Sequence, residues 1–170
     1  NLDGPENNNI GFLRFTNNNL YTCGGISGGN FGPNIPGSIQ IWDGNRWNIY
    51  QNRLDTITGH SYRDLASVDI DPLDDSHVFA AGRTGLYEFR NGKFVKEYNY
   101  DNSPLKTTAA IDGPSKDYTM VETVKFDQKG SLWLLNSGSA TTSLFEITKD
   151  GQWIDHHKKE LQNTSSRAYD

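Results

Sequence analysis

The chain has 170 residues and a formal net charge of −5, which is enough sequence for one domain with its own core. The acidic balance argues against a nucleic-acid partner, because phosphate-backbone affinity depends on clustered Lys and Arg. Cys23 is the one cysteine, so an internal disulfide and a Cys-rich zinc site are excluded, and the absence of a stretch of about 18 apolar residues predicts no membrane span.

The first part of the chain predicts a tail followed by four short strands. Residues 1–9 are polar and are expected either to be disordered or to lie as a tail on the first blade. Strands are predicted at about 10–16 and 20–24, joined by an Asn-rich turn, then at 38–42 and from Trp47 onward. Together these strands form a first unit over residues 10–50.

The Gly-rich segment 24–37 contains a G-x-S-x-G match at residues 25–29. A hydrolase nucleophile elbow needs a helix directly after the serine. Here residues 30–33 read Asn-Phe-Gly-Pro, which cannot start a useful helix. The segment is therefore predicted to be a loop and not an elbow.

A crossover over residues 51–64 leads to a second unit at 65–98, whose start is rich in aspartate. Clustered carboxylates suit calcium, but Asp69, Asp71, Asp74 and Asp75 lack an EF-hand spacing. Because Asp69 and Asp71 alternate with apolar residues, we interpret them as a solvated strand edge followed by an Asp-Pro turn. No metal and no cofactor are predicted.

A second crossover, residues 99–119, leads to a third unit at 121–157 that contains the clearest hairpin of the chain, VKFDQKGSLWLL (124–135). Aligning the ends of the first strands matches Phe15, Ile70 and Phe126, which are 55 and 56 residues apart. Units of four short strands at such a period predict an all-β propeller, and an ordinary antiparallel sandwich is the alternative. We predict one partial domain over residues 1–170, with three blades in an open, incomplete ring.

Three blades leave two sheet faces without a neighbour, so either further blades of a longer parent chain or a second copy should cover them. The longer loops, 24–37, 51–64, 99–119 and 136–142, are expected on one face of the propeller. Ligands of scaffold folds usually bind to such loops. The candidate ligand-binding residues on this face are Phe31, His60, Tyr62, Arg63, Arg83, Lys116 and Tyr118. No residue is predicted to be catalytic.

The segment Asp127 to Trp133, DQKGSLW, resembles the repeat of the two-component-regulator propellers of Bacteroidota, as does IDPLDDSHVFAAGRTGLYEF (70–89). DNSPL (101–105), FDQKGSLWLLNSG (126–138) and TKDGQW (148–153) are similar to PorZ-like propellers of type IX secretion. The resemblance covers about residues 65–157, and the first unit departs from it because Asn17-Asn18-Asn19 replaces the Asp-to-Gly turn.

This resemblance implies a periplasmic or cell-surface module without enzymatic activity, which binds an oligosaccharide or a protein. In the regulators such a module is the sensor domain of a signal-transduction protein. A surface platform of type IX secretion is one alternative, and a polysaccharide hydrolase or lyase is another.

Overall fold

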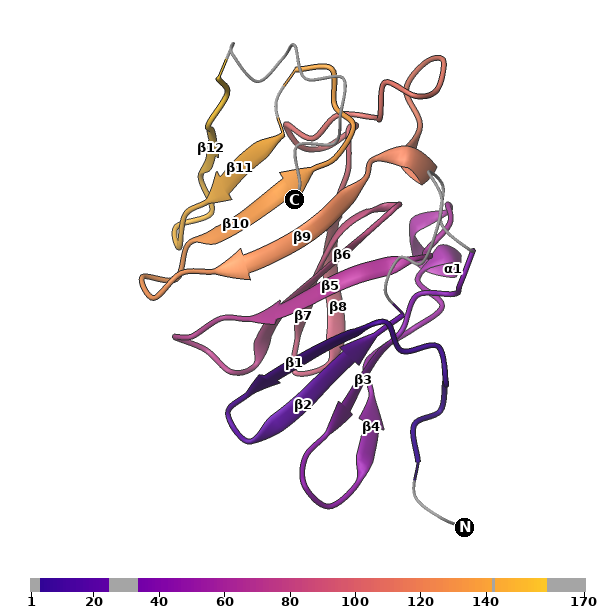
Figure 1. The fold of residues 1–170 in the computed structure, drawn as a ribbon, viewed down its shortest axis with the longest axis vertical. Coiled ribbons are helices and arrows are strands. Elements are labelled where there is room, and N and C mark those ends of the chain that lie inside the picture. Colours follow the sequence, from indigo (N-terminus) through magenta and orange to yellow (C-terminus); the bar gives the residue numbers. More distant parts are fainter. Residues whose placement is uncertain (1–3, 25–33, 142, 159–170) are drawn as a thin grey trace.

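The computed structural model describes residues 4–24, 34–141 and 143–158. The predicted fold class is confirmed, because these residues form three four-stranded antiparallel sheets and very little helix (Figure 1). In each sheet the strands follow one another in chain order, as in the blades of a propeller. No helix of the described residues is long and apolar enough to cross a membrane.

The three sheets are called blades 1, 2 and 3. Blade 1 contains β1 (Phe12–Thr16), β2 (Asn19–Cys23), β3 (Ile39–Trp42) and β4 (Trp47–Ile49). Blade 2 contains β5 (Leu65–Ile70), β6 (His77–Gly82), β7 (Gly85–Arg90) and β8 (Lys93–Tyr98). Blade 3 contains β9 (Val121–Phe126), β10 (Leu132–Asn136), β11 (Leu144–Ile147) and β12 (Trp153–Asp155). Two short helices, α1 (Asp55–Thr58) and η1 (Lys116–Tyr118), lie in the crossovers between blades.

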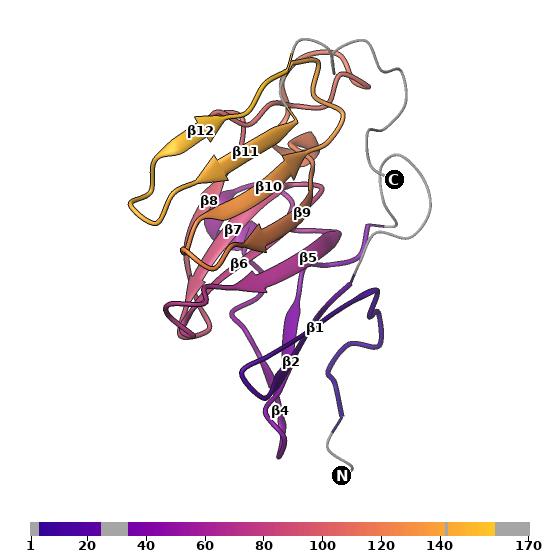
Figure 2. The same ribbon diagram turned by 60° about the vertical axis from the view of Figure 1, so that its left-hand side comes forward.

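The blades are stacked through their first strands, with β5 between β1 and β9 (Figures 1 and 2). One apolar core lies between blades 1 and 2 and a second lies between blades 2 and 3. We call the side of a blade that faces the blade before it the preceding face, and the opposite side the following face. Among the described residues, blade 2 is therefore covered by a blade on both faces, whereas blades 1 and 3 are each covered by a blade on one face.

The turn between the first two strands of blade 1 forms without the glycine that the equivalent turn of blade 3 contains. Asn17 and Asn18 have φ values of 49° and 62°, the left-handed conformation that a two-residue hairpin turn needs and that Asn adopts more readily than most residues. In the equivalent turn of blade 3, Gly130 has φ 85° and Asp127 accepts hydrogen bonds from the backbone of Lys129 and Ser131. The first two strands of a blade are thus joined by a two-residue turn in blade 1 and by a five-residue turn in blade 3.

One sequence interpretation is wrong. Asp69 is not at a solvated strand edge, because it is 1% exposed on the following face of the covered blade 2. Its Oδ2 accepts a hydrogen bond of 2.7 Å from the Phe126 backbone N–H in blade 3, and its Oδ1 lies 2.7 Å from Nε of Arg14 in blade 1. Asp69 therefore ties all three first strands together. Alternation with apolar residues indicates a solvated face only where one side of a sheet meets water.

Candidate functional site

The longer loops meet on one side of the described blades, around a buried ion pair. The Asp64 carboxylate is 3.1 Å from Nε of Arg83 in the β6–β7 turn and accepts a 2.7 Å hydrogen bond from the Ile35 N–H. The Arg83 guanidinium also donates to Asn34 and lies over the Tyr118 ring, 5.4 Å from its centroid. The β2–β3 loop, both crossovers and a blade 2 turn are thus held in one arrangement.

The crossover that follows blade 1 carries a histidine whose two ring nitrogens lie near carboxylates, one within and one beyond hydrogen-bond distance. Thr58 ends α1, Gly59 turns the chain with φ 73°, and His60 follows. Its Nε2 is 2.6 Å from a Glu97 carboxylate oxygen, and its Nδ1 is 3.6 Å from Asp117. The hydrogen bond to Glu97 raises the pKa of His60 above its ordinary value, although burial opposes this shift. His60 therefore connects blade 2 to the second crossover.

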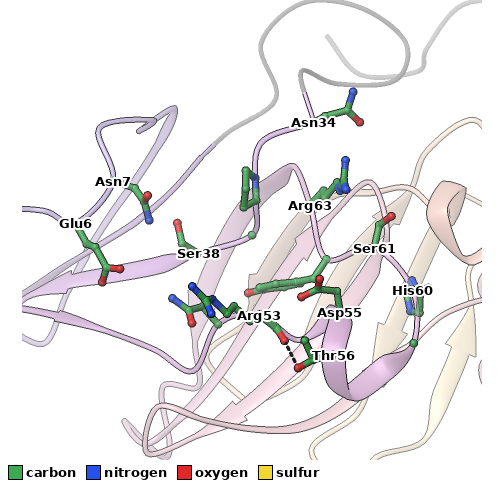
Figure 3. Close-up of a pocket in the computed structure, with 15 residues that line it drawn as sticks. Glu6, Asn7, Asn34, Ser38, Arg53, Asp55, Thr56, His60, Ser61 and Arg63 are labelled. Carbon is green, nitrogen blue, oxygen red and sulfur yellow. Dashed lines mark hydrogen bonds between the residues drawn. The ribbon is translucent and has the colours of Figure 1, made fainter.

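Beside this framework lies an open groove of about 900 Å³, which we call the loop groove (Figure 3). Its floor is fixed by close packing, since a Cβ on Gly37 would lie 2.6 Å from the Tyr62 ring. Its walls come from the N-terminal segment, the end of the β2–β3 loop and the first crossover. The lining residues are Glu6, Asn7, Asn34, Pro36, Gly37, Ser38, Asn52, Arg53, Asp55, Thr56, Gly59, His60, Ser61, Tyr62 and Arg63.

The groove lining is polar and carries charges of both signs. Arg53 and Arg63 are exposed, and neither guanidinium makes an ion pair with a described residue. Glu6 and Asp55 are exposed acidic groups of the same lining. Such a surface can pair with charged and amide groups of a ligand. Tyr62 is the one aromatic residue among the described lining residues, and its side chain is buried, so it offers no aromatic platform.

The structure does not bring all the candidate residues together. His60, Tyr62 and Arg63 line the groove, while Lys116 and Tyr118 belong to the neighbouring crossover that contacts the buried pair. Tyr62 and Arg83 are also candidate ligand-binding residues, but they are only 4% and 5% exposed under the loops that pack on them, so they offer a ligand little surface. Phe31 and the G-x-S-x-G segment lie outside the described residues.

Lys116 is held by its own partner, since its Nζ is 3.1 Å from the Asp101 carboxylate, which raises the pKa of the amine. The sequence interpretation missed Arg53, Asp55 and the N-terminal segment as groove residues. The N-terminal segment reaches the groove because Asn7 exchanges two backbone hydrogen bonds with the buried Gln40 side chain on β3. No sequence pattern indicates this contact between a side chain and a backbone 33 residues away.

No family model and no curated protein sequence matches the chain. Among solved structures, the chain is similar to PorZ of Porphyromonas gingivalis, which is described as an essential bacterial surface component of the type-IX secretion system. The similarity has a TM-score of 0.80 and 25% sequence identity, and it covers 97% of this chain. The chain spans only 22% of PorZ, about a fifth of that protein. This structural match supports the PorZ-like resemblance, whereas the two-component-regulator resemblance stays a prediction.

Among the described residues, no group of three or more His, Cys, Asp or Glu side chains is arranged to hold a metal ion. The aspartates after β5 instead organise their own turn. Asp71 accepts a hydrogen bond from the Leu73 N–H, and Asp74 accepts one from the Ser76 N–H. These bonds are the Asx pattern that Asp side chains form in turns.

Proposed function

We propose that the chain is part of a bacterial extracytoplasmic propeller that acts as a binding platform, and that its loop groove takes a charged segment of a protein. The observation that carries the proposal is the groove itself, whose exposed Arg53 and Arg63 stand on a framework fixed by the buried Asp64–Arg83 pair. A rigid framework under exposed charged groups limits the ordering that binding requires.

The extracytoplasmic setting is supported by the similarity to PorZ, which is described as a bacterial surface component. By the same similarity, a platform role in type IX secretion is favoured over the sensor role that the regulator repeats suggest. The sensor role would also use a ligand on this face, so a ligand alone does not separate the two. Separation requires the remainder of a parent protein, where a kinase would identify a regulator.

A protein segment fits the groove better than an oligosaccharide. The described lining supplies guanidinium, carboxylate and amide groups, which pair with the charged side chains and backbone of a peptide. Sugars stack well on exposed aromatic faces, and the aromatic ring of the described lining is buried. A glycan therefore remains the alternative outcome of the binding test.

We also propose that the platform is not an enzyme. The histidine of the groove is the residue type most often used as a general base. Here Nε2 of His60 is already hydrogen-bonded to a Glu97 carboxylate oxygen at 2.6 Å, and Nδ1 is a buried atom 3.6 Å from Asp117, so neither ring nitrogen is open to a ligand in the groove. Its buried position serves to connect blade 2 with the second crossover.

The test is binding of the purified chain to an array of charged peptides and, in parallel, to an oligosaccharide array. We expect binding to peptides and loss of at least tenfold in affinity for Arg63→Ser, because a charge-assisted hydrogen bond contributes about 1.5–3 kcal/mol. Arg46→Ser is the matched control, since Arg46 lies in the β3–β4 turn, away from the groove lining, with a side chain 74% exposed. Retention only on oligosaccharides, or equal affinity of the two variants, would overturn the proposal.

A further inference from the structure

The first strands of the blades carry alternating charges at one equivalent position. Arg14, Asp69 and Lys125 each directly precede the repeat positions Phe15, Ile70 and Phe126. The Asp69 carboxylate is 2.7 Å from Arg14 of the blade before it and 3.5 Å from Lys125 of the blade after it. Around the ring the order is therefore positive, negative, positive, and each contact between neighbours joins opposite charges.

The repeat residues Phe15, Ile70 and Phe126 lie on the preceding faces of the three blades, and their exposure shows where another blade covers that face. Ile70 is 5% exposed in the core against blade 1. Phe126 packs on Phe79 of blade 2, with 5.9 Å between the ring centroids. Phe15 occupies the same position in blade 1 but is 72% exposed, and Leu13 on the same face is 58% exposed. The position is fully or partly buried in both blades that have a preceding blade against it, so the exposed apolar face of blade 1 has the character of a blade-to-blade surface.

On the following faces, too, the residue at one equivalent position is buried where a next blade covers it. Tyr21 and Phe79 pair in register with Arg14 and Asp69, and both aromatic rings are 4% exposed beneath the next blade. The equivalent residue of blade 3 pairs with Lys125 in the same way.

That residue is Trp133, which is only half-buried and stacks on His156 of its own blade at 4.7 Å between ring centroids. Lys125 beside it is 51% exposed. Among the described residues no blade covers these two side chains. A blade docked here would bury the Trp133 ring and bring its own first strand beside Lys125.

We propose that these two open faces bind further four-stranded blades that carry Asp or Glu at the position equivalent to Asp69, and that they do not bind a second copy of this chain. A second copy that closed a six-bladed ring would bring Lys125 of one copy beside Arg14 of the other, twice. Like charges at a partly desolvated contact oppose association, whereas every neighbouring pair within the chain is complementary.

A longer protein has the residues to supply such blades. PorZ, which is similar along 97% of this chain, is more than four times as long, because the chain spans 22% of it. The proposal rests on the blade fold and its charges and is independent of the ligand that the loop groove takes.

The test is the mass of the 170-residue chain by sedimentation velocity at low-micromolar concentration. We expect the unaltered chain to sediment as a 19.1 kDa monomer. Lys125→Glu should form a dimer, because a carboxylate at this position can pair with Arg14 of a second copy. Lys129→Glu, which makes the same charge change in the exposed β9–β10 turn, is the matched control and should stay monomeric.

Lys125→Gln removes the repulsion without placing a second carboxylate next to Asp69. It should associate more than the unaltered chain and less than Lys125→Glu, and it provides the test if the glutamate variant does not fold. A dimer of the unaltered chain would overturn the proposal. So would Lys125 variants that associate no more than the Lys129→Glu control.

Discussion

Replacement of Asp69 tests whether one buried carboxylate joins the three blades. In Asp69→Ala the Phe126 N–H loses its 2.7 Å acceptor inside the fold, and Arg14 and Lys125 lose their shared anion. Asp69→Asn is the milder comparison variant. Its amide oxygen can still accept a hydrogen bond from the Phe126 N–H, but the negative charge is removed.

The expected loss of stability in the Asp69 variants depends on how exposed the partners of the carboxylate are. A buried N–H left without an acceptor costs about 1–3 kcal/mol. Breaking a fully buried ion pair costs about 3–5 kcal/mol, but the Arg14 side chain is 35% exposed and keeps part of its hydration, so the ionic contribution lies well below that range. We therefore expect Asp69→Ala to lower the free energy of unfolding by about 3 kcal/mol and Asp69→Asn by about 1–2 kcal/mol.

The assay is urea unfolding followed by tryptophan fluorescence, with thermal melts as a second measure. For a chain of this size 1 kcal/mol corresponds to about 2–4 °C in Tm. Asp112→Ala is the control, because Asp112 is exposed in the second crossover and should change stability by no more than about 0.5 kcal/mol. If Asp69→Ala were as stable as this control, the three-blade connection would not stabilise the fold and the argument would be refuted.

Three further predictions concern residues of the first crossover and of strands β6 and β10. The hydrogen bond to Glu97 raises the pKa of His60 above 6.5. Protonated His60 should therefore stabilise the fold fully below pH 6.5, and this contribution should be lost as the pH rises through the raised pKa. Thermal melts at a series of pH values should show the decline, and His60→Asn should reduce it. Gly82→Ala should lower stability by about 1–3 kcal/mol in urea unfolding, because the added Cβ would clash with the Asp64 carbonyl oxygen. Asn136→Ala should cost about 3 kcal/mol, since this fully buried amide makes three hydrogen bonds to the backbone of the second crossover and the start of blade 3.

Each of these predictions has a defined failure. A stability profile of His60→Asn parallel to that of the unaltered chain would show that His60 does not cause the pH dependence. Gly4→Ala, whose new Cβ would have no neighbour within 4 Å, is the control for Gly82→Ala, and equal stability of the two would contradict the steric argument. A cost below about 1 kcal/mol for Asn136→Ala would show that water replaces its hydrogen bonds.

The blades could be predicted from the sequence because their signals are local. Alternation over five or six residues and a turn with Asn, Asp or Gly define each hairpin, and repetition then defines the blade. The Asp127 to Gly130 turn could be predicted without knowledge of the remaining chain, since the hydrogen bonds that its backbone N–H groups donate stay within five residues.

The site could be predicted only in part. Loop lengths predicted one side of the propeller for the loops that carry His60 and Arg63, because strand direction fixes where each loop emerges. Burial of Tyr62 and Arg83 could not be predicted, since it depends on how loops separated by tens of residues pack on one another. The burial of Asp69 could not be predicted for a similar reason, because it depends on blades 1 and 3 covering both faces of blade 2.

The central claim is that the loop groove binds a protein segment without chemical change. Isothermal titration calorimetry of an array-selected peptide, followed by mass spectrometry of the recovered peptide, tests both parts together. We predict one binding event per chain, affinity weakened at least tenfold by Arg63→Ser but unchanged by Arg46→Ser, and a recovered peptide of unaltered mass. Equal affinity of the Arg63→Ser variant and the unaltered chain would place binding elsewhere, and a cleaved or modified peptide would identify an enzyme.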